Sequence, residues 1–188
     1  MDIKPYRTKD FFTLTTALTE ARYECATDSL IVGCVLSGIK HIEADGVCIT
    51  LHKGDMFFVG KGVYAEINIP VGAHAYSDIT ASFSAHELRL LQNQTRPMAL
   101  CHRGSAITER IGKIANVLNG ELFEFFEEQE RAMLGFRYSF FPELGRQAKL
   151  KLINLLRLHT GDAFAQIVEN QTTYNDTIIA TECDIIYS

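Results

Sequence analysis

Short hydrophobic runs alternate with turn residues between residues 22 and 84, as expected for a series of antiparallel strands. The longest run covers 30–36, and glycines follow at positions 38, 46, 54 and 62. Asp45-Gly46 lies between two alternating runs and favours a type I′ hairpin, because both central residues of that turn need a positive φ. The pattern predicts strands at 22–25, 30–36, 40–44, 48–51, 56–59, 64–69 and 74–84.

The first 28 residues have a weaker pattern. Residues 15–20 show no firm period, and the strand at 22–25 is the first that the pattern supports. We therefore predict an extended arm that leads into this strand.

The hydrophobic period changes after Ser84. Ser84 and Glu87 have the spacing of a capping box, which predicts a helix at 85–91. Ile107, Ile111, Ile114 and Leu118 recur at intervals of four, three and four residues, which predicts a helix at 107–118. Further amphipathic segments predict helices at 121–134, 143–160 and 162–168.

Strands that precede helices indicate an α+β fold and not alternating βαβ units. Regular turns between short strands predict an antiparallel β-barrel or jelly roll, which hides its strand edges. We therefore predict an N-terminal arm and barrel at 1–92, a helical region at 93–170 and a linker-like segment at 171–188.

Alternation along the strands selects candidates for the interior of the barrel. Such side chains either line a cavity for a small ligand or fill the barrel with hydrocarbon, and the pattern leaves both alternatives open. The candidates are Tyr23, Cys25, Val35, Phe57, Val59, Tyr64 and Phe83.

Composition narrows the functional classes. Hydrophobic residues make up 47% of the 188 residues, which is ample for a packed core. The formal net charge of −5 is unfavourable for binding the phosphate backbone of DNA. The five cysteines form no C-x-x-C pair, so we expect free thiols in a reducing cytoplasm. No basic-then-apolar leader and no hydrophobic run of transmembrane length are evident, and we expect no membrane partner.

Three segments resemble a known family: Leu36-Ser-Gly-Ile-Lys-His-Ile-Glu, Leu51-His-Lys-Gly-Asp-Met-Phe-Phe-Val and Gly60-Lys-Gly-Val-Tyr. They are similar to the cupin barrel in the N-terminal half of AraC-family transcriptional regulators. The resemblance implies a barrel that senses a small-molecule effector or a regulatory protein, and helices that dimerise. It also implies that DNA binding, typical of such activators, belongs to a C-terminal helix-turn-helix domain beyond these residues, whose linker and first residues would be 171–188.

The same resemblance allows a test for metal chemistry. A catalytic cupin gathers neutral imidazoles around a metal ion, and its second motif ends in a histidine and an asparagine. Here Ala65 and Ile69 stand at those two positions, Gly60 replaces the motif's proline, and no two histidines lie within two residues of each other. We therefore predict no metal, cofactor or catalytic residue, and a protein that is not an enzyme. The alternatives are a small cupin isomerase or dioxygenase, or a binding module controlled by a protein partner.

The segment Gln147-Ala-Lys-Leu-Lys-Leu-Ile-Asn-Leu-Leu resembles the helix that precedes the linker in these regulators. Its hydrophobic residues extend beyond one helix face, so we expect the helix to be buried against its own barrel and, on a second side, against a partner. We predict a homodimer, with the interface drawn from Leu150, Leu152, Leu155, Leu156 and Leu158. Packing against the chain's own core alone remains the alternative.

Overall fold

The computed structural model describes residues 2–5, 11–95, 110–135, 142–160 and 163–171. Its strands form two five-stranded sheets. Sheet A contains, in spatial order, β1 (Asp2–Pro5), β3 (Ala21–Thr27), β8 (Gly62–Ile69), β5 (Ile39–Ala44) and β6 (Val47–His52). Sheet B contains β10 (Ile111–Asn116), β7 (Asp55–Val59), β4 (Leu30–Ser37), β9 (Tyr76–Phe83) and β2 (Thr13–Ala17).

The pairing of the strands is that of a jelly roll. Strand β2 pairs with β9, β3 with β8, β4 with β7, and β5 with β6. These nested antiparallel pairs describe one long hairpin that is rolled up, and the pairs β4–β9 and β5–β8 then join it into two facing sheets. Strand β1 adds to sheet A beside β3, in parallel, and β10 adds to sheet B beside β7. The predicted α+β fold with a jelly roll followed by helices is confirmed.

The turn chemistry of the strands agrees with the sequence. Asp45 and Gly46 have φ values of 53° and 78°, as the predicted hairpin between β5 and β6 requires. Strand β2 was not predicted, because its threonines mask the alternation. In the structure it is held by pairing with β9 and buries Thr15 and Ala17.

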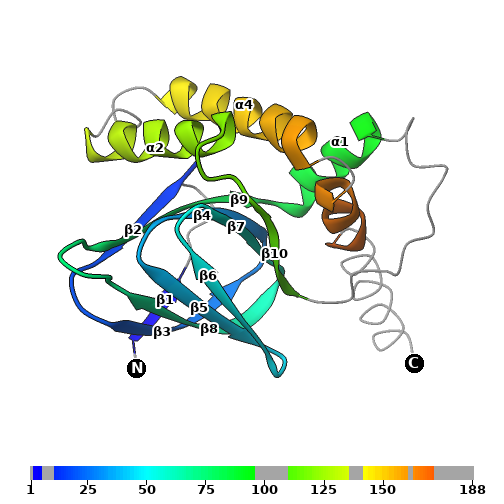
Figure 1. Cartoon of the computed structure of the whole chain (residues 1–188). Helices are drawn as coiled ribbons and strands as arrows, with labels where there is room; N and C mark the ends of the chain where they lie inside the picture. Colours follow the sequence, from blue (N-terminus) through cyan, green and yellow to red (C-terminus); the bar gives the residue numbers. More distant parts are fainter. Residues whose placement is uncertain (1, 6–10, 96–109, 136–141, 161–162, 172–188) are drawn as a thin grey trace, which may run out of the picture.

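Helices α1 (Ala85–Thr95), α2 (Glu121–Leu134) and α4 (Pro142–Thr160) follow the roll, with a further helix at 163–171. The predicted bounds of α2 are confirmed, and α4 begins one residue earlier than predicted. Helices α2 and α4 lie side by side over sheet B (Figure 1). Residues 96–109 and 172–188, where parts of the helical region and the linker were predicted, lie outside the described residues.

The helix predicted at 107–118 is wrong for its described part, because Ile111–Asn116 forms strand β10. A spacing of three residues places Ile111 and Ile114 on opposite faces of a strand. Sheet B separates two hydrophobic cores, so Ile111 packs inside the roll and Ile114 packs on the helical side. Gly112 allows the strand to lie against Phe58, since a Cβ atom there would come within 2.5 Å of the Phe58 ring.

The two cores lie on either side of sheet B. The interior core, between the sheets, contains Ala17, Cys25, Ile31, Val35, Ile42, Ala44, Leu51, Phe57, Val59, Tyr64, Tyr76 and Ile111. The outer core joins the other face of sheet B to the helices, with Phe12, Phe83, Phe126, Leu152 and Phe164 among its members. Burial on both faces explains the continuous hydrophobic run of β4, whereas the strands of sheet A alternate between buried and exposed residues.

Candidate functional site

A group of polar side chains lies in the interior of the roll, within a hydrophobic surrounding. At its centre is Lys40 of β5, whose side chain is 1% exposed. Its Nζ atom donates hydrogen bonds to Glu66 Oε2 at 2.6 Å, Asp78 Oδ2 at 2.8 Å and Asn68 Oδ1 at 3.2 Å. An ammonium group has three N–H donors, and each of them has an oxygen acceptor here. We call Lys40, Glu66, Asn68, Tyr76 and Asp78 the Lys40 cluster.

The register of the strands brings these residues together. Lys40 pairs with Asn68 and Ile42 pairs with Glu66, so the side chains from β5 and β8 are neighbours on the inner face of sheet A. Asp78 projects from β9 of sheet B. The cluster therefore connects the two sheets across the interior core.

Tyr76 completes the cluster on the side of sheet B. Its hydroxyl group donates a hydrogen bond to Asp78 Oδ2. Burial, together with the nearby carboxylate of Asp78, raises the pKa of Tyr76 well above its usual value. Tyr76 therefore remains a neutral phenol and a hydrogen-bond donor at physiological pH.

The acceptors in the cluster outnumber its donors. The other carboxylate oxygen of Asp78, Oδ1, is buried and accepts no hydrogen bond from any described protein group. Formally, two carboxylates face one ammonium group. A buried acceptor without a donor is unfavourable, so the cluster has unused capacity to accept a hydrogen bond.

Aromatic rings form part of the wall around the ammonium group. Lys40 Nζ lies 5.6 Å from the centroid of the Phe57 ring and 5.7 Å from that of Tyr76. Such distances allow a favourable interaction between a cation and the ring face. The environment of Nζ is therefore suited to a positive charge.

The cluster lies near one end of the roll. Lys40 comes two residues after Gly38, where the chain turns from β4 to β5, and Gly38 lies against Ile69 O and Tyr76. Tyr76 is the first residue of β9 and follows the loop 70–75. This loop is largely exposed, and a bridge between Val71 and His74 narrows its tip.

Most of the predicted interior residues lie where the sequence placed them. Cys25, Val35, Phe57, Val59 and Tyr64 belong to the interior core, and Tyr23 packs against it while partly buried. Phe83 does not lie there. It is part of the outer core, 6.4 Å from the Phe164 ring, because β9 turns Tyr76 and Asp78 inward and the residues at odd numbers outward.

The residues of the Lys40 cluster were not among the predicted candidates. Glu66 and Asn68 follow Tyr64 at intervals of two, so they share its inward direction. Lys40 likewise precedes the inward Ile42 by two residues. Alternation could have identified them, but a search for hydrophobic inward positions passes over polar side chains.

The described histidine, cysteine, aspartate and glutamate side chains are the possible metal ligands or reactive groups. Among the described residues, no three His, Cys, Asp or Glu side chains come together as metal ligands. Of the described cysteines, Cys25 and Cys34 are buried and Cys48 is exposed, all as free thiols. Burial is the main reason that the pKa of the Cys34 thiol is raised, and the nearby carboxylate of Asp78 raises it further. The thiol therefore stays protonated and unreactive.

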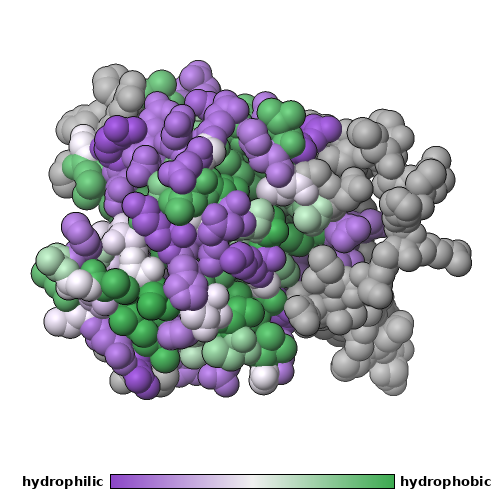
Figure 2. All heavy atoms as spheres, viewed as in Figure 1, coloured by the Kyte–Doolittle hydropathy of each residue, from purple (hydrophilic) through white to green (hydrophobic). Residues whose placement is uncertain are grey.

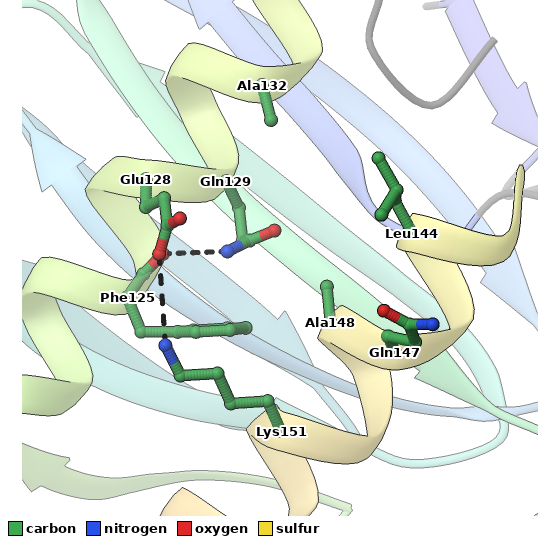
Figure 3. A pocket seen from close by; sticks show the side chains of 8 residues that line it. All are labelled: Phe125, Glu128, Gln129, Ala132, Leu144, Gln147, Ala148 and Lys151. Atoms are coloured by element: carbon green, nitrogen blue, oxygen red, sulfur yellow. Dashed lines mark hydrogen bonds and ion pairs between the residues drawn. The ribbon is translucent and has the colours of Figure 1, made fainter. Parts of the chain in front are cut away.

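A second feature lies on the helical layer. A groove of about 210 Å³ runs between α2 and α4 (Figure 3). Its lining residues are Phe125, Glu128, Gln129, Ala132, Leu144, Gln147, Ala148 and Lys151. Lys151 Nζ lies 3.9 Å from Glu128 Oε2, so a charged pair spans the groove above the Phe125 ring. We call this feature the helical groove.

The predicted dimer residues of α4 separate into two groups. Leu152, Leu155 and Leu156 are buried in the outer core of their own chain. Leu150 and Leu158 are 62% and 73% exposed. Only these two of the five predicted leucines are accessible to a partner.

The helical layer has a mixed surface. Figure 2 shows mostly hydrophilic side chains over α2 and α4, with separate hydrophobic ones between them. Exposed glutamates prevail on α2, including Glu121, Glu124 and Glu128, whereas α4 exposes Arg146, Lys151 and Arg157. None of the described helices is long and hydrophobic enough to cross a membrane.

Comparisons with known proteins complete these observations. No protein-family model matches the sequence, and no curated protein matches it. Solved structures with a similar arrangement include the AraC-like transcriptional activator CuxR, at 13% identity over 88% of this chain, with a TM-score of 0.46. ToxT from Vibrio cholerae is 9% identical over 74% of this chain, with a TM-score of 0.48. EutQ from Clostridium difficile is 16% identical over 39% of this chain, with a TM-score of 0.33.

The chain spans 53% of CuxR, 58% of ToxT and 55% of EutQ. A Schizosaccharomyces pombe cupin domain is a further similar structure, at 16% identity over 45% of this chain, with a TM-score of 0.33.

Proposed function

We propose that this chain is the regulatory domain of an AraC-type transcriptional regulator in the cytoplasm, with DNA binding assigned to a domain outside these residues. The resemblance of three turn and strand segments to this family supports the proposal. The jelly roll with two helices packed on one sheet supports it as well. In this proposal the roll senses an effector and the helical layer joins two copies of the chain.

The single observation that carries the proposal is the division of the leucines on α4. Three of them are buried in the chain's own core, while Leu150 and Leu158 are exposed on the opposite side of the same helix. Large hydrophobic side chains on a charged helix surface favour a binding surface when they recur along one face. Leu150 and Leu158 lie eight residues apart, about two turns along the helix and roughly 80° apart around it, so they share its exposed side.

Charge also favours a second copy as the partner. The exposed surface of α2 is mainly acidic and that of α4 mainly basic. In a twofold interface whose axis lies between α2 and α4, α2 of one chain would lie near α4 of the other, because the same patch is used by both copies. Opposite charges would then face each other around the exposed leucines.

Analytical ultracentrifugation tests this proposal. The wild-type chain should sediment as a dimer at tens of micromolar. Leu150→Glu and Leu158→Glu should each weaken the dimer at least tenfold, because a glutamate in the interface would be an unpaired buried charge. Leu18→Glu is the matched control, since Leu18 is 87% exposed at the β2–β3 turn and lies away from α4. A wild-type monomer at that concentration would overturn the proposal.

Metal analysis tests the alternative of a cupin enzyme. Protein purified without chelators should contain no stoichiometric transition metal if the chain is a regulatory domain. One iron, manganese or zinc ion per chain would support the enzyme instead.

A further inference from the structure

We propose that the effector of this domain binds at the Lys40 cluster and presents a hydrogen-bond donor, as a small primary amine does, and not an anion. This inference rests on the sensing function proposed above and assigns the chemical class of the ligand. It concerns Asp78 above all, with Phe57 and Tyr76 as the walls of the site.

Lys40 is not available as a receptor for an anion. Each of its three N–H donors is directed at an oxygen atom of Glu66, Asn68 or Asp78, at 2.6–3.2 Å. A carboxylate or phosphate would have to displace one of these oxygens and then lie beside the carboxylates of Glu66 and Asp78. Repulsion between like charges in a buried site opposes this arrangement.

The cluster is, in contrast, ready to accept a donor. Asp78 Oδ1 is buried and has no hydrogen-bond partner among the described residues. A ligand ammonium group that donates to Oδ1 would satisfy this oxygen and form an ion pair with the Asp78 carboxylate.

The loop 70–75 supplies the route into the site. It connects β8 to β9 directly above Tyr76, and Val71 at its tip is 48% exposed. Gly72 has a φ of 65°, and a Cβ atom there would have no neighbour within 4 Å, so the chain is open to solvent at this position. Displacement of this loop would uncover Tyr76, which lies at the edge of the cluster beside the loop.

Thermal unfolding and calorimetric titration with three matched series of compounds test the inference. The series are n-alkyl amines, alcohols and carboxylates, each from ethyl to hexyl. Amines of at least one chain length should raise the Tm at millimolar concentration, alcohols should do so less, and carboxylates should have no effect. A carboxylate that stabilises the protein, or the absence of any effect from the amines, would overturn the inference.

Two substitutions locate the site. Asp78→Asn should reduce the affinity for the amine at least tenfold, because the amide cannot supply the negative charge. Tyr76→Phe should increase this affinity, because Asp78 loses the hydrogen bond from the Tyr76 hydroxyl group and becomes a freer acceptor, while the ring is retained. A substitution that only damages the fold could not produce this gain. Asp28→Asn, at an exposed turn, is the control and should not change binding.

Binding that survives Asp78→Asn would place the amine elsewhere and refute the assignment. Sedimentation of the same samples separates this failure from failure of the proposed function. If no amine binds while Leu150→Glu still dissociates the dimer, only the ligand class is wrong. If the wild-type chain is a monomer, the proposed function itself is wrong.

Discussion

Lys40 shows how one residue controls the interior of this domain. Its ammonium group forms ion pairs with two buried carboxylates, and its aliphatic stem passes through the interior core. Lys40→Met would retain most of the volume but remove the ammonium group that pairs with Glu66 and Asp78. Loss of one partner of a buried ion pair costs about 3–5 kcal/mol, and urea unfolding should show a decrease in the free energy of unfolding of this size.

A double substitution provides the control for Lys40. In Lys40→Met/Glu66→Gln one of the two carboxylates is also neutralised, so the protein should recover part of the lost stability. The short distances indicate that the two carboxylates are stabilised by Lys40. A change of less than about 1 kcal/mol in the free energy of unfolding of Lys40→Met alone would contradict this.

Gly33 is required by close packing in the middle of β4. A Cβ atom at this position would lie 2.6 Å from Phe57 Cζ and 2.8 Å from Thr80 Cγ2. Gly33→Ala should therefore destabilise the protein by about 1–3 kcal/mol, as overpacking of a core does. Phe57→Leu in the same chain should restore part of the loss. Gly135→Ala, where the nearest atom lies 3.4 Å away, should be close to neutral in the same denaturation experiment.

Among the elements, α1 depends on a cap that the sequence already indicated. Ser84 Oγ accepts a hydrogen bond from Glu87 N at 3.3 Å, and Glu87 Oε2 accepts one from Ser84 N at 2.8 Å. Lys149 of α4 donates to Glu87 Oε1 at 2.5 Å, which fastens α1 to the helical layer. Ser84→Ala should destabilise the protein by about 0.5–2 kcal/mol.

The pH dependence of this cap has a definite sign. Burial alone would raise the pKa of Glu87, but hydrogen bonds from Lys149 and Ser84 outweigh it and lower the pKa below its usual 4.5. The carboxylate therefore contributes stability above about pH 4.5, and this contribution is lost as the pH falls through the folded-state pKa. Glu87→Gln should flatten the curve of stability against pH in this range, while Glu124→Gln, on an exposed face, should not.

Strand β10 is held to the roll by a second carboxylate. Asp55 accepts hydrogen bonds from Lys113 Nζ at 2.7 Å, Asn116 Nδ2 at 2.6 Å and the backbone N–H of His52 at 3.0 Å. Burial opposes ionisation of Asp55, yet these donors lower its pKa. The contacts explain why residues with the spacing of a helix are fixed as an edge strand beside β7.

At the scale of the whole molecule, the proposed dimer predicts a thermal stability that depends on concentration. Association stabilises the folded state by mass action, so the Tm of the wild-type chain should rise between micromolar and hundreds of micromolar protein. Leu150→Glu should remove this dependence, while Leu18→Glu should retain it. A wild-type Tm that stays constant over this range would contradict a dimer in dynamic equilibrium with its monomer.

Local patterns in the sequence determined much of the architecture. The Asp45-Gly46 hairpin, the cap at Ser84 and the bounds of α2 depend on residues that are close together in the chain, and all three are confirmed. Their physical causes are the allowed φ values, the unpaired N–H groups at a helix start and the helical period. These causes act within a few residues, so they can be recognised in one segment.

Only the tertiary structure decided which face of an element is buried and against what. Ile111 and Ile114 have a helical spacing, but the two cores on either side of sheet B made their segment a strand. Phe83 faces the helices, and the buried leucines of α4 were distinguished from Leu150 and Leu158 only by packing. Lys40, Glu66 and Asp78 are as far as 38 residues apart, and a polar residue is stable inside a roll only when partners from other strands satisfy it. Such partners are set by strand register across the fold, which no single segment encodes.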